Sequence, residues 1–419
     1  MSQSPRPPLM SLDEALSSLL SQIKPVEGAE SVSTLDADGR VLAQDLVSAL
    51  QVPAFDNASM DGYAVRSADL SQPDVELTVT QRIPAGHFGQ ALLPGQAARI
   101  FTGAPVPPGA DAIVMQEEAE LVSAQGPALV RFANRAAPGQ WIRRSGEDVR
   151  SGQTVLQRGR KLGPAELGLA ASLGRAQLLV SARPKVALFS TGDELVMPGD
   201  KRPEDMPPGA IYNSNRFFLR ALLNRMGCVV TDMGIVPDQR DATLHALQNA
   251  AEQHDLIVTS GGVSVGEEDH VKPAVQSLGA LALWQIAMKP GKPFAFGHVN
   301  RVQGPGSAYF VGLPGNPVSS FMTFLLLVKP LLLALQGADQ KEVVWTPMPA
   351  HFEWPKADKR REFVRVRRNL QGGLDLFPNQ SSGVLTSVSW GDGVVDNPAG
   401  HTIAWGDRVH FSPFSEWLS

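Results

Sequence analysis

The segment DLIVTSGGVSVGEEDH (residues 255–270) decides the fold of the domain around it. An apolar run, Leu256–Val258, leads directly into a loop that contains Gly261, Gly262 and Gly266 and ends in acidic residues. Such a run followed by a glycine loop predicts a buried strand and the turn after it. Glycine can take positive φ and turn successive backbone N–H groups inward, which makes a cradle for a phosphate. The acids would repel that phosphate, and a Mg²⁺ ion between them would remove the conflict.

Strands and helices alternate on both sides of this segment, from residue 183 to residue 335. The predicted strands include KVALFS, CVVTDMGIV and AYFVGL, and the predicted helices include NSNRFFLRALLNRMG and RDATLHALQNAAEQ. This alternation predicts a mostly parallel sheet that is covered by helices on both faces. The fold class that we predict is therefore multidomain α/β and β, with this α/β domain at its centre.

Unusual loops follow the predicted strands of this domain, at residues 190–195, 236–241, 260–269 and 313–317. Ligands of open α/β sheets bind beyond the carboxyl ends of the strands, so these loops should open onto one edge. In the last loop, LPGNP, Asn316 can cap the next helix and leave N–H groups pointed at an anion. Each loop alone could be a tight strand-to-helix turn, but together they predict a binding site.

Acidic and basic side chains gather in the same region. The acids are Asp193, Glu194, Asp238, Glu267, Glu268 and Asp269. Adjacent side chains cannot all point inward, so either Glu267 or Glu268 is expected to cap a helix or face solvent. Lys289 and Lys292 lie in AMKPGKP (287–293), where prolines stiffen the loop. Stiffening favours anion ligands over mobile surface lysines, which are the alternative.

The rest of the chain forms further regions. Ser11 and Glu14 make a capping box that predicts a helix over residues 11–23, and Pro164 begins a second predicted helix over residues 163–174. Short apolar runs between Gly, Pro and Asp clusters predict an all-β insertion. The predicted domains are a discontinuous elongated domain (1–50 and 143–182), an inserted β domain (51–142), the α/β domain (183–335) and a C-terminal β domain (340–419).

The C-terminal region contains an alternating basic tract. EFVRVRRNLQGGLDLF predicts a hairpin around Gly372 and Gly373, with Arg365 and Arg367 on its solvated face. Two other loops carry many special residues, DNASMDGYAV (56–65) and FTGAP (101–105), but their spacing alone assigns them no role.

Composition excludes several classes of function. The chain has 419 residues and a formal net charge of −5, which argues against nucleic-acid binding. The one cysteine, Cys228, lies in an apolar run and is expected in the core, so there is no disulfide or thiolate metal cluster. The longest apolar run (321–335) contains Lys329 and Pro330, and the N-terminus lacks a signal-peptide pattern. We expect a soluble, cytoplasmic protein without a membrane partner, and the sequence shows no convincing nucleophile constellation.

Motifs along almost the whole chain resemble one family. They are DNASMDGYAV, RIFTGAPVPPGADAIVMQE, RRSGEDV, LFSTGDEL, TSGGVSVGEEDH, MKPGKPFAFG and GLPGNPVSSF, in that order. The sequence closely resembles the molybdopterin molybdenumtransferase family, which is related to the C-terminal domain of gephyrin. The resemblance implies an elongated homodimer with its active sites at the subunit interface. It also implies insertion of molybdenum from molybdate into adenylylated molybdopterin, with Mg²⁺ and release of AMP.

The resemblance also assigns roles to residues that match the family motifs. Asp61 and Thr102 would act from the β domain of the partner subunit, and Lys289 and Lys292 would contact phosphate or molybdate. Metal or substrate would be held by Glu194, Asp238 and Asp269. Molybdopterin and the anions would contact Thr102, Gly261, Gly262, Ser264, Gly266, Pro314, Gly315, Asn316, Arg361 and Ser382. Molybdopterin adenylyltransferase and other proteins of the pathway would be further partners.

A few positions depart from the family pattern. ASMDGYA transposes the usual Ser-Ala order, Asn213 replaces a common acid, and Trp390 replaces a small residue. The contacts of the C-terminal region are therefore the least secure. Two alternatives remain open: molybdopterin adenylyltransferase, which would use ATP and needs only a domain like residues 183–335, and a scaffold similar to gephyrin. The stiff loops with acids and lysines favour an enzyme over a scaffold.

Overall fold

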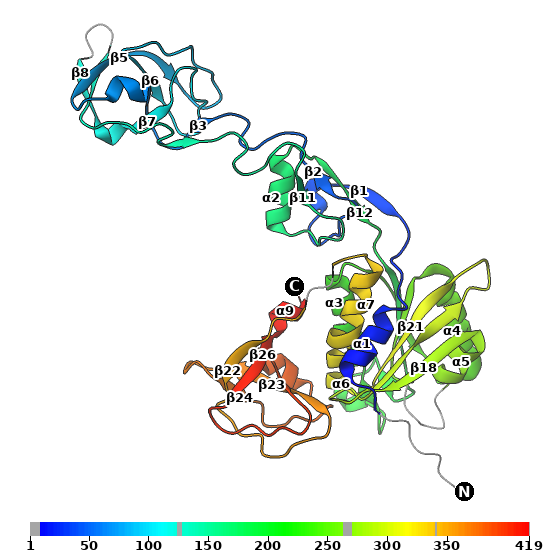
Figure 1. Cartoon of the computed structure of the whole chain (residues 1–419). Coiled ribbons are helices and arrows are strands. Elements are labelled where there is room, and N and C mark those ends of the chain that lie inside the picture. Colours follow the sequence, from blue (N-terminus) through cyan, green and yellow to red (C-terminus); the bar gives the residue numbers. More distant parts are fainter. Residues whose placement is uncertain (1–8, 124–127, 263–269, 340–341, 419) are drawn as a thin grey trace.

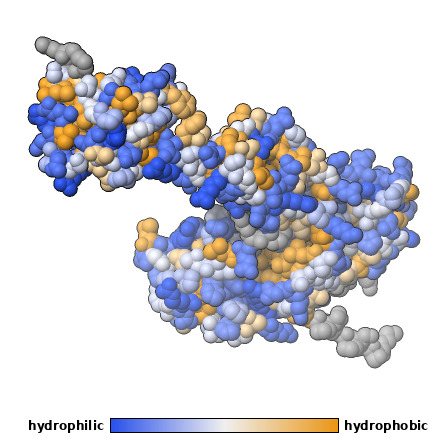
Figure 2. All heavy atoms as spheres, turned by 45° about the horizontal axis from the view of Figure 1, so that its top comes forward, coloured by the Kyte–Doolittle hydropathy of each residue, from blue (hydrophilic) through white to orange (hydrophobic). Residues whose placement is uncertain are grey.

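The computed structural model describes residues 9–123, 128–262, 270–339 and 342–418. The chain is elongated, with a β domain at one end and the α/β and C-terminal domains at the other (Figure 1). A narrow elongated domain joins the two ends. Figure 2 shows the β domain as a lobe that stands apart from the rest of the molecule. In the part of the chain that the structure describes, the elongated domain separates the β domain from the α/β domain (Figure 1 and Figure 2).

The α/β domain is built on a six-stranded sheet with the order β16-β13-β17-β21-β20-β18. The strands are β13 (Lys185–Thr191), β16 (Val229–Val236), β17 (Leu256–Ser260), β18 (Gly279–Gln285), β20 (Pro293–Asn300) and β21 (Ser307–Leu313). The first four in this order run parallel, whereas β20 and β18 add an antiparallel edge. This confirms the predicted mostly parallel sheet.

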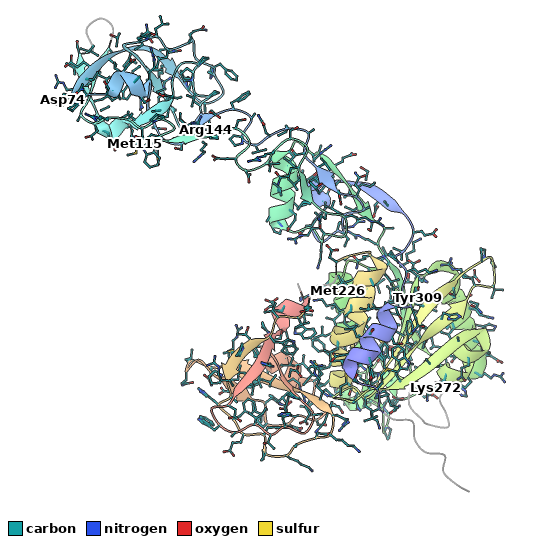
Figure 3. The ribbon with its side chains drawn as sticks, in the orientation of Figure 1. Asp74, Met115, Arg144, Met226, Lys272 and Tyr309 are labelled. Carbon is teal, nitrogen blue, oxygen red and sulfur yellow. The ribbon has the colours of Figure 1, made fainter. Side chains whose placement is uncertain are left out.

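Helices cover both faces of this sheet, as predicted. One face packs against α4 (Arg240–Gln253) and α5 (Val271–Leu278), and the other packs against α3 (Ser214–Arg225) and a long helix after Pro317. α1 (Leu12–Leu20) begins with the predicted capping box of Ser11 and Glu14. α1 packs on the same face as the long helix, so this segment belongs to the α/β core and not to the elongated domain in which we had placed it. The hydroxyl of Tyr309, labelled in Figure 3, donates to the carbonyl of Gln22 just beyond α1.

The long helix is the centre of the largest hydrophobic cluster. It consists of α6 (Pro317–Thr323), a π-helical turn (Phe324–Val328) and α7 (Lys329–Leu335). Its length and apolar composition would suit a membrane span, but 78% of its most apolar window is buried inside the protein. This burial identifies it as a core helix, and the apolar pattern follows from packing on both sides.

The elongated domain consists of short paired strands and one helix. β1 (Ala29–Ser33) pairs with β12 (Gln177–Ser181), β2 (Leu46–Val47) pairs with β11 (Thr154–Leu156), and α2 (Pro164–Ser172) packs beside them. Pro164 occupies the first turn of α2, as predicted. The pairs join segments far apart in sequence, so the β domain is inserted between the two halves of this domain.

The β domain contains a six-stranded sheet with the order β7-β4-β6-β5-β9-β8. The strands are β4 (Gly62–Val65), β5 (Val75–Ile83), β6 (Gln96–Ile100), β7 (Ala112–Met115), β8 (Ala119–Ser123) and β9 (Leu129–Phe132). A short pair, β3 (Asn57–Ala58) and β10 (Ile142–Arg143), lies where this domain meets the elongated one. At this base Arg144, labelled in Figure 3, donates to the carboxylate of Asp56 at 2.6 Å.

The C-terminal domain shares a sheet with the α/β domain. Its strands are β22 (Thr346–Pro349), β23 (Arg361–Arg368), β24 (Leu374–Leu376), β25 (Gly393–Asn397) and β26 (Arg408–Pro413). β19 (Met288–Lys289), from the lysine loop, pairs in parallel with β23. α9 (Phe414–Leu418) packs against the long helix, where the ring centres of Phe414 and Phe321 are 5.5 Å apart. This shared sheet fixes the lysine loop against the C-terminal domain.

Candidate functional site

Two predicted loops meet at the carboxyl edge of the parallel strands. The backbone N–H of Gly261, after β17, donates to the carbonyl of Leu313 at the end of β21, at 3.1 Å. The side-chain Nδ2 of Asn215 in α3 donates to Ser260 Oγ and to the carbonyl of Gly315, both at 2.8 Å. Asn215 is 7% exposed, so these are buried bonds that hold the glycine loop and the LPGNP loop together. Sequence reasoning did not single out Asn215.

The first two glycines of the loop are required by close packing. Gly261 has φ +95°, and a Cβ there would lie 2.9 Å from the carbonyl oxygen of Thr191. Gly262 has φ +66°, and a Cβ there would lie 2.5 Å from Val271 Cγ2. Only glycine fits such positions without displacing the neighbouring backbone. The loop therefore begins with the positive φ angles that we expected for glycine, while Ser264, Gly266 and Asp269 lie outside the described residues.

Several buried polar atoms at this edge have no hydrogen-bond partner in the described part of the chain. They are Ser190 Oγ, Asn213 Nδ2, Asn215 Oδ1, Thr259 Oγ1, Ser320 Oγ and Thr323 Oγ1. An unpaired buried polar atom costs about 1–3 kcal/mol. Such atoms usually mark a strained or functional region. The atoms of Ser190, Thr259 and Asn215 lie at the carboxyl ends of the strands or bond a residue there, and they support this edge as a candidate ligand site.

The predicted metal ligands are only partly placed by the structure. Glu194 is exposed and Asp238 is half-buried, and both lie in loops at the strand edge. The backbone N–H of Asp238 donates to Asp193 Oδ1 at 3.3 Å, so the two loops touch. Among the described residues no group of three or more His, Cys, Asp or Glu side chains could hold a metal ion. The third predicted ligand, Asp269, falls outside them.

The two loop lysines differ in their surroundings. Lys289 Nζ lies 2.9 Å from Glu362 Oε1 and 3.3 Å from Asp358 Oδ2, and Glu362 is 2% exposed. Lys289 therefore neutralises a buried carboxylate of the C-terminal domain. Lys292 is half-buried and makes no side-chain contact with a carboxylate in the described part of the chain. Of the two lysines, Lys292 is the one whose charge is available to an anion.

The other basic candidate, Arg361, is also paired. Its guanidinium makes two 2.7 Å bonds to Asp396 and a 3.3 Å bond to Asp13 of α1. The Asp396 carboxylate raises the pKa of Arg361 above its usual value. Arg361 thus joins the C-terminal domain to α1.

Ser382 contacts the start of the long helix through its backbone. Its carbonyl accepts a 2.9 Å hydrogen bond from the N–H of Val318 in the first turn. One N–H group that we had expected to face an anion is therefore used within the protein. Asn316 is the N-cap residue, but its side chain makes no capping hydrogen bond, so that prediction was wrong. The Asn316 side chain is consequently not committed to the helix.

Arg365 corrects a second prediction. We had placed it on the solvated face of a hairpin, but it is 2% exposed and among the largest fully buried side chains. Arg367, two residues further, is exposed and its guanidinium lies 4.5 Å from the ring centre of Trp390. The alternating Arg and Val pattern of a strand is identical whether its polar face is exposed to water or covered by another segment. The sequence therefore offered no signal for this burial.

The β-domain candidates form a small, separate constellation. The N–H and Oγ of Thr102 both donate to Asp61 Oδ1, at 2.8 and 2.7 Å. These hydrogen bonds, with a smaller effect from Arg99, hold the pKa of Asp61 below its usual value. The sequence suggested both residues, and the structure brings them together. They lie at the far end of the molecule from the glycine loop (Figure 1).

The fold, together with the loops at the carboxyl ends of the parallel strands (the strand edge), defines the chain as a molybdenum-cofactor biosynthesis protein of the MoeA type. Family models match over almost the whole chain: "MoeA N-terminal region (domain I and II)" at 10–174, "Probable molybdopterin binding domain" at 187–334, and "MoeA C-terminal region (domain IV)" at 347–414. These matches place the strand edge in the molybdopterin-binding segment.

Individual relatives agree over most of their length. The chain is 43% identical to a molybdopterin molybdenumtransferase of Haemophilus influenzae over 345 residues, 82% of this chain and 81% of the relative. It is 34% identical to one of Nostoc sp. over 95% of this chain and 91% of the relative. A crystal structure of a molybdopterin biosynthesis moeA protein from Pyrococcus horikoshii matches with a TM-score of 0.82 and 29% identity, over 97% of this chain and 100% of that one. The chain belongs to the molybdopterin molybdenumtransferase family, which confirms the resemblance seen in its motifs.

Proposed function

We propose that this chain inserts molybdenum from molybdate into adenylylated molybdopterin, in a Mg²⁺-dependent reaction that releases AMP. As a member of its family, the chain is a transferase of the molybdenum-insertion step in molybdenum cofactor biosynthesis. The substrates, the metal and the released nucleotide are the finer parts of the proposal. We also propose a cytoplasmic location and contact with the molybdopterin adenylyltransferase that would supply the substrate.

The observation that carries the proposal is the joined pair of loops at the strand edge. Asn215 ties Ser260 of the glycine loop to Gly315 of the LPGNP loop, and unpaired buried polar atoms surround them. Backbone N–H groups in such loops suit a phosphate or pyrophosphate oxygen. An adenylylated pterin carries a pyrophosphate between two ring systems. Such an extended ligand suits a site formed by two neighbouring loops, the glycine loop and the LPGNP loop.

The donor set at this edge is compatible with Mg²⁺. Glu194 and Asp238 supply carboxylate oxygens from neighbouring loops, and Mg²⁺ is usually bound by one or two carboxylates and by substrate phosphates. These two residues would hold the ion together with Asp269. The ion would supply charge neutralisation at the phosphate oxygens.

The protein's own groups can then work by positioning and electrostatics. The glycine-loop N–H groups would bind the pyrophosphate oxygens, and Lys292 would place a positive charge beside the oxyanion. An oxygen of water or molybdate attacks the adenylate phosphorus, and the bond from this phosphorus to the bridging oxygen breaks, so that the bridging oxygen stays on the pterin phosphate. With water the product is AMP directly, whereas with molybdate a Mo–O bond must also break, which leaves the oxygen on AMP and frees molybdenum for the pterin sulfurs. Orientation and charge stabilisation are sufficient for phosphoryl chemistry without a protein nucleophile. This agrees with the lack of a nucleophile constellation in the sequence.

The separation of the two constellations supports a homodimer as the active form. Asp61 and Thr102 lie in the β domain, far from the strand edge of the same chain (Figure 1). A second copy related by twofold symmetry would bring its β domain to this edge in both subunits at once. We therefore propose that each active site combines the α/β and C-terminal domains of one subunit with the β domain of the other.

Release of AMP from adenylylated molybdopterin, with and without molybdate, tests the proposal. The wild type should release AMP in a molybdate-dependent and Mg²⁺-dependent manner. Asp238→Asn should lower that rate by about 10²-fold, because it removes a carboxylate from the phosphate-binding edge. The matched control is Asp241→Asn, which removes an exposed acid from the first turn of α4 and should leave the rate unchanged.

The same assay separates the alternatives. Consumption of ATP with free molybdopterin, without AMP release from the adenylylated form, would identify an adenylyltransferase. A folded, dimeric protein with neither activity would point to a scaffold.

A further inference from the structure

Arg365, in the middle of β23, is a buried cation whose partners are neutral. Its Nε donates to Ser387 Oγ at 3.2 Å, its Nη1 to the carbonyl of Phe363 at 3.1 Å, and its Nη2 to the carbonyl of Ser381 at 3.4 Å. In the described part of the chain no carboxylate pairs with it. Burial lowers the pKa of Arg365 to about 10, so the side chain remains a cation at neutral pH.

Three neighbouring cations, Arg360, Arg361 and Lys289, are each paired with a carboxylate. Arg360 bonds Asp358 through Nε at 3.0 Å and Nη2 at 2.9 Å. Arg361 is paired with Asp396, and Lys289 is paired with the buried Glu362. The protein thus supplies carboxylates to the cations at the edge of this region but leaves the most deeply buried guanidinium without one.

An uncompensated buried charge is unfavourable for folding. The effective penalty is several kcal/mol per ion, and replacing a buried ionic group by an apolar one of similar volume is often neutral or stabilising. The neutral hydrogen bonds of Arg365 offset only part of this penalty. A role that required only volume would be served by an apolar side chain, so we interpret the guanidinium through its hydrogen bonds and its charge.

The position of Arg365 links it to the strand edge. Side chains two apart in a strand share a face, and Phe363 packs in the cluster that contains the long helix. Arg365 therefore lies on the side of β23 that faces the α/β domain. Gln380 clamps its backbone, with N–H to Oε1 at 2.9 Å and Nε2 to carbonyl at 2.8 Å. Arg365 thus fixes the segment from Phe377 to Ser387.

This segment reaches the first turn of the long helix. Ser382 follows the Ser381 that Arg365 bonds, and its carbonyl accepts from Val318 N–H. Val318 in turn lies two residues after Asn316 of the LPGNP loop. Two hydrogen bonds, joined by short stretches of backbone, therefore connect the buried guanidinium to the loop that forms the candidate anion site.

We infer that Arg365 is a positioning residue for a tetrahedral oxyanion bound between the α/β and C-terminal domains. Its guanidinium holds the Ser381–Ser382 segment near the start of the long helix, and it adds a positive charge that makes no ion pair with a carboxylate among the described residues. This inference rests on the proposed function, for which the oxyanion is molybdate. Within the described residues, Lys292 is a further cation near this edge without a carboxylate partner.

The test compares Arg365→Met with the matched control Arg367→Met. Both remove one positive charge from the same face of the same strand, but Arg367 is exposed. For Arg365→Met we expect a Tm equal to or above that of the wild type. We also expect the apparent KM for molybdate to rise by about tenfold, the effect of one unit charge several ångström away in a partly dehydrated cleft, with kcat at saturation little changed. Arg367→Met should match the wild type in both measurements.

A second variant and a binding measurement keep the inference open to refutation. Arg365→Lys keeps the positive charge but loses the forked guanidinium, so its KM for molybdate should fall between those of the wild type and Arg365→Met. If Arg365→Met does not fold, Arg365→Lys serves as the test. A lower Tm with an unchanged KM in either variant would overturn the inference. Calorimetric titration of molybdate into the dimer needs no turnover. If the wild type releases no AMP, the proposed function fails, whereas equal molybdate affinity in wild type and Arg365→Met defeats only the inference.

Discussion

The α/β domain and the β domain each carry half of the candidate site, and their halves differ in what they leave unsatisfied. At the carboxyl ends of the α/β strands, several buried polar atoms have no partner among the described residues, and Asn215 of α3 joins the loops. In the β domain, the Asp61 carboxylate is already held by two hydrogen bonds from Thr102. The α/β domain therefore has polar groups that could bind a ligand, whereas the β domain presents a carboxylate whose position is already fixed by hydrogen bonds.

The comparison is the reason for proposing that two chains form each site. A preset acid contributes to a reaction only when it reaches the bound substrate, and the β domain of the same chain lies at the opposite end of the molecule (Figure 1). The elongated domain lies between them (Figure 1), and in the proposed dimer it would place Asp61 at the site of the partner subunit. The four predictions below break or sharpen this comparison, in order of expected effect.

The largest effect should come from mixing two inactive variants. Asp61→Asn keeps the Oδ1 acceptor for Thr102 but loses the charge, and Lys292→Ala removes the unpaired cation of the other half. Each variant alone should lose about 10²-fold in rate. Because half of the dimers in an equal, re-equilibrated mixture are mixed, and each mixed dimer holds one intact site, about a quarter of wild-type activity should return. An AMP-release assay measures it, and a mixture as inactive as its components would refute a shared site.

Removal of the paired lysine should act on stability. Lys289→Ala leaves Glu362 buried with only Trp354 Nε1 at 2.8 Å and Asn397 Nδ2 at 3.4 Å as donors. We expect the free energy of unfolding to fall by about 1–3 kcal/mol. Lys292→Ala is the control, and it should change stability by less than about 0.5 kcal/mol. Denaturant titration distinguishes them, and equal losses would show that the pairing of Lys289 has no structural weight.

The acid limb of activity should depend on Thr102. Its hydrogen bonds hold the pKa of Asp61 below the usual value of about 3.9. The pKa of Asp61 is lower in the folded state than in the unfolded chain. Its contribution to the free energy of unfolding is therefore complete at pH values above the unfolded pKa and is lost as the pH falls through the folded pKa. Thr102→Ala removes the hydroxyl donor and should move the Asp61 titration upward. Carboxyl carbon NMR of both proteins measures the shift, and identical titrations would contradict the role of the hydroxyl.

The smallest effect concerns the contact between the long helix and the C-terminus. Lys329 Nζ donates to the carbonyls of Trp417 at 2.7 Å and Glu416 at 3.2 Å. Burial, with a smaller effect from Lys161, lowers the pKa of Lys329 to about 8. Between this value and the unfolded pKa of about 10.4 the unfolded chain binds more protons, so stability should rise with pH. The gain in Tm from pH 7.5 to 9.5 should be smaller in Lys329→Met, and an equal gain would exclude Lys329 as its source.

Much of the fold was predictable because local patterns carry it. The capping box of Ser11 and Glu14, the Pro164 helix start and the alternation of strands and helices depend on periods of a few residues. The glycine loop was recognisable for the same reason, since positive φ is a local requirement at Gly261 and Gly262. Because each loop follows a predicted parallel strand, the sequence implied that the loops meet at the same end of the sheet. The resemblance of the motifs to a known family then indicated the reaction.

The tertiary structure alone decided the state of each charge. Lys289 and Glu362 are 73 residues apart in sequence, and their ion pair exists because β19 joins β23. Arg365 is buried because the segment from Phe377 to Ser387 covers its face of the strand, which no alternating pattern can reveal. Local sequence determines which conformation a segment takes, whereas the burial and pairing of a side chain depend on which distant segment packs against it.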